Sequence, residues 1–115
     1  MEKNVEMGML LDIYGSMLTK KQYELLNDYY NNDLSLSEIA ENENITRQAV
    51  RDNLKKGEKK LFEFEEKLKV MKKQLDQEEK IASILSNINK LDENSTDEEV
   101  VEILEYVKRN LSALV

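Results

Sequence analysis

The sequence predicts an all-α protein, and three observations support that prediction. The 115 residues include no Pro, which is the strongest helix breaker, and only three Gly. Charged residues make up 36% of the chain and apolar residues 40%, and the abundant Glu, Lys and Leu lose little side-chain freedom in a helix. Apolar residues also recur at helical spacing along the whole chain, which disfavours disorder. A chain of this length forms one small domain, with at most an appendage.

The first two predicted helices precede residue 32. An apolar stripe with steps of three and four residues predicts a helix over residues 4–16. Thr19 and Gln22 then have capping-box spacing, so a second helix is expected to begin there and to end near Asn31. The apolar face of this second helix is expected to use Tyr23, Leu26 and Tyr30.

Residues 36 to about 55 have the pattern of a helix-turn-helix. Ser35 and Glu38 form a second capping box, Asn44 tolerates the positive φ of a tight turn, and Thr46 is a favourable N-cap for the next helix. The residues expected to bring the two helices together are Ala40, Ile45 and Val50. Many helical proteins contain such a turn without touching DNA, so the pattern by itself leaves the function open.

A long helix is predicted from Arg47 onward. Its apolar residues step by three and four, as in a coiled-coil seam, at Leu61, Phe64, Leu68, Met71 and Leu75. A bend or a new helix is expected near Asp76, and residues 91–96 form a loop before a last amphipathic helix. Because these stripes need apolar partners, the sequence predicts a homodimer through the long helix, with back-folding within one chain as the alternative.

The charge distribution divides the chain. The net charge is −7, yet the segment from Thr46 to Lys60 contains six basic and two acidic residues, whereas the residues from Leu61 onward include eight basic and thirteen acidic ones. One short segment could therefore face a polyanion while the remainder repels it. The predicted organisation is a helix-turn-helix domain with its N-terminal helix over residues 1–68, followed by a coiled helical extension over residues 69–115.

Several functional classes are disfavoured. The chain has no His and no Cys, so an enzyme would need a carboxylate pair or an activated Lys, and no such arrangement is discernible. We therefore expect no catalytic residue, no metal site and no cofactor. No apolar run approaches the ~18 residues of a membrane span, and acidic residues interrupt the apolar N-terminal stretch, unlike in a signal peptide. A cytoplasmic protein that does not bind membranes is expected.

The run LTKKQYELLNDYYNNDLSLSEIAENENITRQAVRDNLKKGEKKL resembles region 4 of bacterial sigma factors. With its helical C-terminal extension and short length, the chain resembles still more closely the YlxM family of small helix-turn-helix proteins. The resemblance implies a sigma-region-4-like helix-turn-helix domain followed by a long helix and a C-terminal helical extension. It also implies a link to the signal recognition particle pathway.

The resemblance further implies which side chains meet nucleic acid. The recognition helix, capped by Thr46, would present Arg47, Gln48, Arg51 and Asp52 to base edges, where Arg suits guanine and Gln suits adenine. The side chains expected near phosphates are Lys55, Lys56 and Lys59 farther along that helix, with Lys20 and Lys21 from the preceding one.

Three functions remain open from the sequence. The first is a dimeric regulator that reads duplex DNA through the helix beginning at Arg47. The second is an accessory of the signal recognition particle machinery that binds RNA or a protein. The third is an interaction module without nucleic-acid affinity, in which the basic residues are an ordinary solvated helix face.

Overall fold

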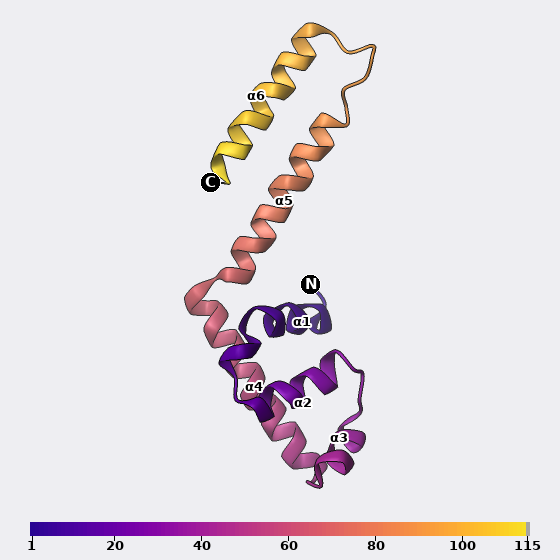
Figure 1. Ribbon diagram of the computed structural model, residues 1–115, viewed down its shortest axis with the longest axis vertical. Coiled ribbons are helices and arrows are strands. Elements are labelled where there is room, and N and C mark those ends of the chain that lie inside the picture. The colour runs from indigo at the N-terminus through magenta and orange to yellow at the C-terminus, as the bar shows by residue number, and fades with distance from the viewer. Residues whose placement is uncertain (115) are drawn as a thin grey trace. The chain divides into compact units, whose positions relative to one another are not determined.

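In a computed structural model, which describes residues 1–114, the chain is all-helical, as predicted. The elements in this range are α1 (Lys3–Tyr14), the 3-10 turn η1 (Gly15–Met17), α2 (Lys20–Tyr30), α3 (Leu36–Glu43), α4 (Arg47–Leu68), α5 (Val70–Ile88) and α6 (Asp97–Ala113) (Figure 1). The chain divides into two compact units, the first covering Met1–Met71 and the second beginning at Lys72. Within residues 1–114, every helix is too short or too polar to cross a lipid bilayer.

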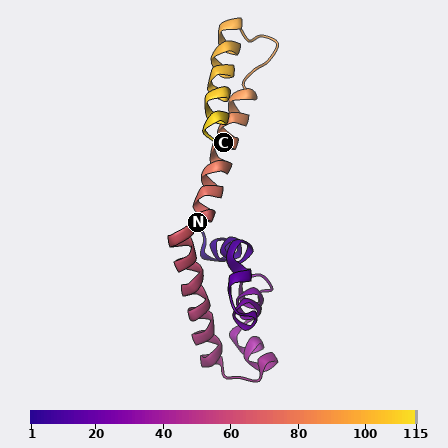
Figure 2. The same cartoon turned by 60° about the vertical axis from the view of Figure 1, so that its left-hand side comes forward.

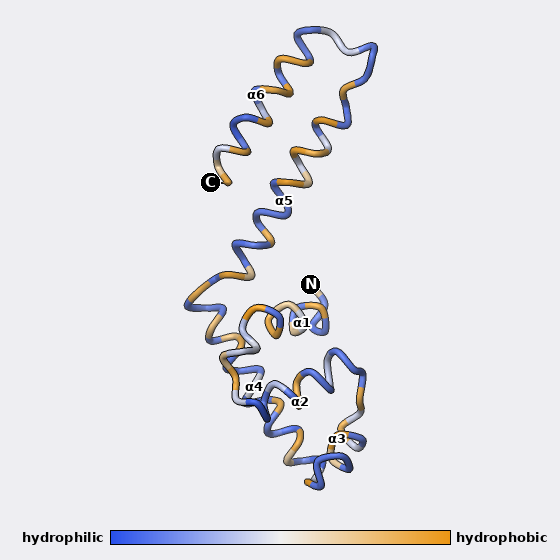
Figure 3. The backbone as a smooth tube through the Cα atoms, in the orientation of Figure 1, coloured by the Kyte–Doolittle hydropathy of each residue, from blue (hydrophilic) through white to orange (hydrophobic). Residues whose placement is uncertain are grey.

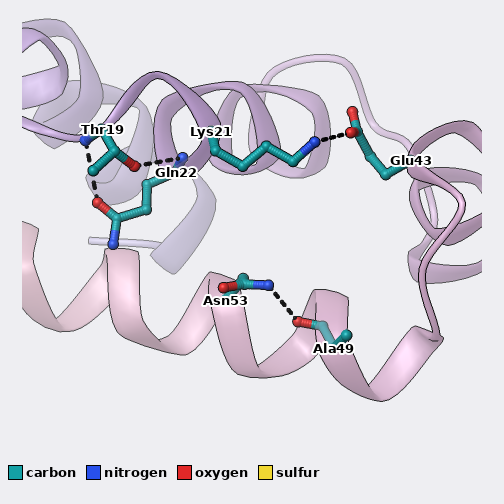
Figure 4. Close-up of polar contacts among 6 residues, drawn as sticks. All are labelled: Thr19, Lys21, Gln22, Glu43, Ala49 and Asn53. Carbon is teal, nitrogen blue, oxygen red and sulfur yellow. Dashed lines mark hydrogen bonds and ion pairs between the residues drawn. The ribbon is translucent and has the colours of Figure 1, made fainter.

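Capping boxes set the starts of helices in both units. At α2, the Thr19 hydroxyl accepts from the backbone N–H of Gln22 at 3.1 Å, and the Gln22 side chain accepts from the backbone N–H of Thr19 at 3.2 Å (Figure 4). Ser35 with Glu38 at α3 makes the same reciprocal pair, which confirms both predicted boxes. Local sequence alone therefore satisfies the unpaired N–H groups that begin these helices.

The first unit is built around α4, which packs against α1, α2 and α3. Its fully buried side chains are Met7, Leu10, Leu26, Ile39, Val50 and Leu61, each with 0% of its surface exposed. Where α4 meets α2, a Cβ built on Gly57 would lie 2.7 Å from Cδ1 of Leu26. Gly57 lies inside a continuous helix, so its role is this close approach and not a bend.

Three sequence expectations about the core need correction. Tyr23 is 40% exposed and Ile45 36% exposed, so neither is a core residue. The predicted dimer seam is partly used inside the chain, because Leu61 is buried and both Phe64 and Met71 pack against the core of the first unit. Leu68, in contrast, is 54% exposed. The seam therefore does not form one continuous free surface.

The long helix breaks at Lys69 and not near Asp76. Lys69 adopts a left-handed conformation with φ 55°, and α5 then runs unbroken from Val70 to Ile88. At the break, the hydroxyl of Tyr14 donates to Oε1 of Glu65 at 2.7 Å and accepts the backbone N–H of Val70 at 3.2 Å. The same Glu65 oxygen accepts the next backbone N–H, that of Met71, at 2.9 Å. These side chains satisfy the first N–H groups of α5, as an N-cap would.

The raised pKa values of two tyrosines predict that the protein becomes less stable at high pH. Burial, followed by a hydrogen bond to a carboxylate, raises the pKa of Tyr14 beside Glu65 and that of Tyr30 beside Glu58. Above about pH 10 the unfolded chain releases these protons while the folded chain keeps them, so the free energy of unfolding falls as pH rises. Urea unfolding between about pH 9 and about pH 11 should show this decline, and replacing both tyrosines by Phe should flatten it. An equally steep decline in the double variant would contradict the assignment.

The second unit is a hairpin in which α5 and α6 lie side by side and antiparallel (Figures 1 and 2). The hydroxyls of Ser83 and Tyr106 are hydrogen-bonded across it, and Ile84 is buried, with 5% of its surface exposed. Thr96 and Glu99 form a capping box that begins α6. Polar and apolar residues alternate along both helices at helical spacing (Figure 3). Several of the apolar side chains lie outside the contact between α5 and α6 and remain exposed.

Candidate nucleic-acid interface

The turn between α3 and α4 has the geometry that its sequence predicts. Asn44 ends α3 in the left-handed region at φ 54°, ψ 45°. Its backbone N–H donates to the carbonyl of Glu41 at 3.3 Å, and that of Ile45 donates to the carbonyl of Ala40 at 3.1 Å. The Thr46 hydroxyl then accepts the backbone N–H of Ala49 at 3.0 Å, which caps the start of α4.

Packing on the inner side of α4 determines which residues face outward. Val50 and Leu54 are buried, at 0% and 4% exposed, and the α3 residues Ile39 and Ala40 are buried at 0% and 6%. Because residues of a helix are spaced by about 100° around its axis, this contact turns Arg51 and Asp52 toward solvent. The first two turns of α4 are thus held rigidly with one face open.

The candidate residues of α4 lie on that open face. Every one of them is exposed, namely Thr46, Arg47, Gln48, Arg51, Asp52, Lys55, Lys56 and Lys59. Arg47, Arg51 and Lys55 follow one another at four-residue steps, so their cationic groups form a row along the helix. Within residues 1–114 the ion pairs are Lys3 with Glu58 and Lys21 with Glu43, and neither involves this row.

Two polar residues in the same turns are already engaged. Nε2 of Gln48 donates to Oδ1 of Asp52 at 2.9 Å, so a base contact by Gln48 would compete with this bond. Asn53 is half-buried and donates to the carbonyl of Ala49 at 2.9 Å (Figure 4). It therefore bonds to its own helix and contributes nothing to the exposed face.

The two lysines that begin α2 differ from each other. Lys20 is exposed, whereas Lys21 is paired with the carboxylate of Glu43 (Figure 4), and this hydrogen bond raises the pKa of Lys21. The charge of Lys21 is thus offset by an acid from α3. Sequence reasoning counted Lys60 in the basic segment but missed its contact with α2, in which Nζ of Lys60 donates to Oε1 of Gln22 at 3.3 Å. This contact brings a lysine of α4 to the start of α2, and only the tertiary fold reveals it.

A hollow of 350 Å³ adjoins the cationic row. Arg51 and Lys55 line it together with Lys3 from α1, which sequence reasoning also missed. Nζ of Lys3 lies 3.5 Å from Oε2 of Glu58, another residue of the hollow. The hollow has a mixed lining, in which Tyr29, Tyr30, Leu36 and Leu54 lie beside the charged residues. The exposed row of cations next to it suits contact with a polyanion.

Comparison with known proteins agrees with the helix-turn-helix geometry. Residues 1–104 match the model of a family described as "Putative helix-turn-helix protein, YlxM / p13 like". A UPF0122 protein of Acetivibrio thermocellus is 44% identical over 115 residues, covering 100% of this chain and 98% of that protein. One of Clostridium kluyveri is 40% identical over 111 residues (96% and 100%), and one of Fusobacterium nucleatum is 50% identical over 80 residues (68% and 78%).

Proposed function

The chain belongs to the family of YlxM- and p13-like helix-turn-helix proteins, and from this premise we propose that it binds duplex DNA and regulates transcription in the cytoplasm. In this proposal the helix-turn-helix domain of residues 1–68 contacts DNA, and residues 69–115 bring two chains together. The N-terminal turns of α4 enter the major groove, as the second helix of such a motif does.

The observation that supports the proposal is the exposed row Arg47, Arg51 and Lys55 on a helix whose orientation is fixed by buried contacts. The two arginines lie nearest the start of α4, where side chains reach base edges in this motif. Bidentate pairing of Arg with guanine would give base preference there. The lysines Lys55, Lys56 and Lys59 lie farther along the helix and would contact phosphates, as would Lys20.

The proposal includes a homodimer that reads two half-sites. A two-fold dimer would place two copies of α4 about one DNA turn, roughly 34 Å, apart or at a multiple of that spacing. Dimerisation also raises affinity, because each recognition surface is small and the second half-site is then bound by a surface already held beside the DNA.

Lys55→Ala tests whether the row contacts the DNA backbone. Loss of one phosphate contact should weaken binding to every duplex sequence by a similar factor and should reduce the slope of log affinity against log salt by about 1. Fluorescence anisotropy of a labelled duplex, titrated at several salt concentrations, measures both quantities. A matched control is Lys90→Ala, which removes a lysine from the loop after α5 and should leave the slope unchanged.

Two outcomes would contradict the proposal. One is the absence of measurable affinity of the native chain for duplex DNA at low salt. The other is tighter binding to structured RNA than to any duplex DNA recovered from cells, which would favour the role in the signal recognition particle pathway. Sequencing the nucleic acid that copurifies with the protein, separately as DNA and as RNA, supplies the ligands for this comparison.

A further inference from the structure

The hairpin of α5 and α6 presents an apolar surface that its own helices do not cover. The exposed apolar residues of the hairpin are Ile81, Leu85 and Ile88 from α5 and Val101, Leu104 and Leu111 from α6, each between 42% and 58% exposed. We refer to these six residues as the hairpin face. Six large apolar side chains in water on a two-helix unit form a patch of the kind that marks an interaction site.

The six residues lie on one side of the hairpin. At about 100° per residue, the three from α5 fall within an arc of about 60° and the three from α6 within an arc of about 80°. Both arcs are measured from the less exposed side of each helix, which contains Ser83, Ile84 and Asn87 on α5 and Ile103, Tyr106 and Val107 on α6. Each arc is turned from it by roughly 120° in the same sense, and because the helices are antiparallel, both arcs face the same side. The opposite side is polar: a hollow of 330 Å³ there is lined by Asp76, Glu79, Lys80, Ser83, Tyr106 and Asn110.

The hairpin face carries little charge. On α5 it is continued toward the start of the helix by Gln74 and Gln77, with Glu78 at its edge. On α6, Asp97 and Lys108 lie in the same arc as the three apolar residues, one toward each end of the helix. A mainly apolar surface two helices wide is suited to a second pair of helices, which would complete a four-helix bundle.

Charge at the two ends of the hairpin indicates what the partner is. The end that contains the start of α5 and the end of α6, residues 72–81 and 108–114, is net basic: it has five basic residues, Lys72, Lys73, Lys80, Lys108 and Arg109, against three acidic ones, Asp76, Glu78 and Glu79. The loop end has five acidic residues, Asp92, Glu93, Asp97, Glu98 and Glu99, with the single basic residue Lys90. A helix the length of α6 spans about 25 Å, which exceeds the Debye length of about 8 Å at physiological salt, so the two ends act as separate charges.

We propose that the hairpin face binds the hairpin face of a second copy of this chain in an antiparallel arrangement, forming a four-helix bundle. The arrangement places the acidic end of each hairpin beside the basic end of the other, whereas parallel alignment would bring like charges together. The two-fold axis then runs across the helices, so α6 faces α6 of the partner copy and α5 faces α5. This inference specifies the contact that joins the dimer of the proposed function, and its test involves no DNA.

Leu85→Glu in the full chain tests the surface. The native chain is expected to have twice the mass of one chain in sedimentation equilibrium at micromolar concentration. A carboxylate buried without a partner in the bundle should raise the dissociation constant by about 100-fold or more. Ser86→Glu is the matched control, because it adds the same charge on α5 outside the hairpin face and should leave the mass unchanged. Circular dichroism establishes that each variant remains helical.

Cysteine pairs test the direction, since the native chain has no Cys. Val101 and Leu111 lie at similar distances on either side of the middle of α6. In the antiparallel bundle, Val101 of one copy therefore faces Leu111 of the partner copy. Mixing the Val101→Cys and Leu111→Cys chains under oxidation should give the mixed disulfide. Val101→Cys alone should give little, because its two copies would lie about 15 Å apart, beyond the ~7 Å limit between Cα atoms of a disulfide.

Three results would overturn the inference. A native chain that remains monomeric at about 100 μM, well above typical dimer dissociation constants, would remove the interface. Dimerisation of Leu85→Glu as tight as that of the native chain would place the contact elsewhere. Preferential linkage of Val101→Cys to Ile88→Cys would show α6 facing α5 of the partner in parallel alignment. In each case duplex DNA affinity, measured separately, would still decide the proposed function.

Discussion

Leu26→Ala is expected to lower the free energy of unfolding by about 2–5 kcal/mol. Leu26 is fully buried on α2, and its Cδ1 occupies the space in front of Gly57, where α4 comes closest to α2. Truncation to Ala loses the free energy gained by burying three carbon atoms and leaves a cavity between two rigid helices. Because Gly57 has no side chain that could move into it, the site cannot collapse readily.

Urea unfolding at a fixed protein concentration measures this loss. Leu68→Ala is the control, because Leu68 is 54% exposed on the same helix as Gly57 and should cost far less. In the Leu26→Ala background, Gly57→Ala should recover part of the loss, since the new methyl group fills the cavity and Ala favours a helix by ~1 kcal/mol over Gly. If the effects of the two substitutions simply add, the contact is not as close as described.

Replacing both Arg47 and Arg51 by Ala is expected to weaken binding to the preferred duplex by about 2–6 kcal/mol, since each base-contacting Arg contributes about 1–3 kcal/mol. Both side chains are exposed near the start of α4, and neither takes part in an ion pair within residues 1–114. Their loss should therefore cost little folding stability. Base preference should relax at the positions that they contact.

Competition between the preferred duplex and a scrambled duplex of equal length measures both effects. Arg109→Ala on α6 is the matched control, because it removes the same charge from the hairpin and should leave the preference for the preferred duplex unchanged. An unchanged preference in the double variant, with affinity for all duplexes reduced alike, would assign the arginines to phosphates.

The features that could be predicted from sequence depend on neighbouring residues. The capping boxes at Thr19 and Ser35 follow from side chains within three positions of the backbone groups that they satisfy, and the left-handed turn follows from Asn44 itself, a residue type that tolerates positive φ. Such signals do not require knowledge of the tertiary fold. The exposed face of α4 likewise follows from helical spacing once Val50 and Leu54 are known to face inward.

The features that could not be predicted depend on contacts distant in sequence. The break at Lys69 is accompanied by hydrogen bonds to Tyr14, more than fifty positions earlier, and no Gly or Pro marks it. The pairing of Lys21 with Glu43 and the exposure of Ile45 also result from how α2, α3 and α4 pack together. Periodicity identifies an apolar residue but does not say which neighbour covers it.

The close approach at Gly57 fixes the angular setting of α4 about its long axis. A bulkier group there would press on the Leu26 side chain, and relieving that contact by rolling the helix would swing every outward-pointing side chain, including those of Arg51, almost two turns earlier, and Arg47, almost three turns earlier. Natural variation at Gly57 would therefore change the direction of the exposed side chains of α4, and with it the DNA sequence they prefer, without altering any residue that contacts DNA.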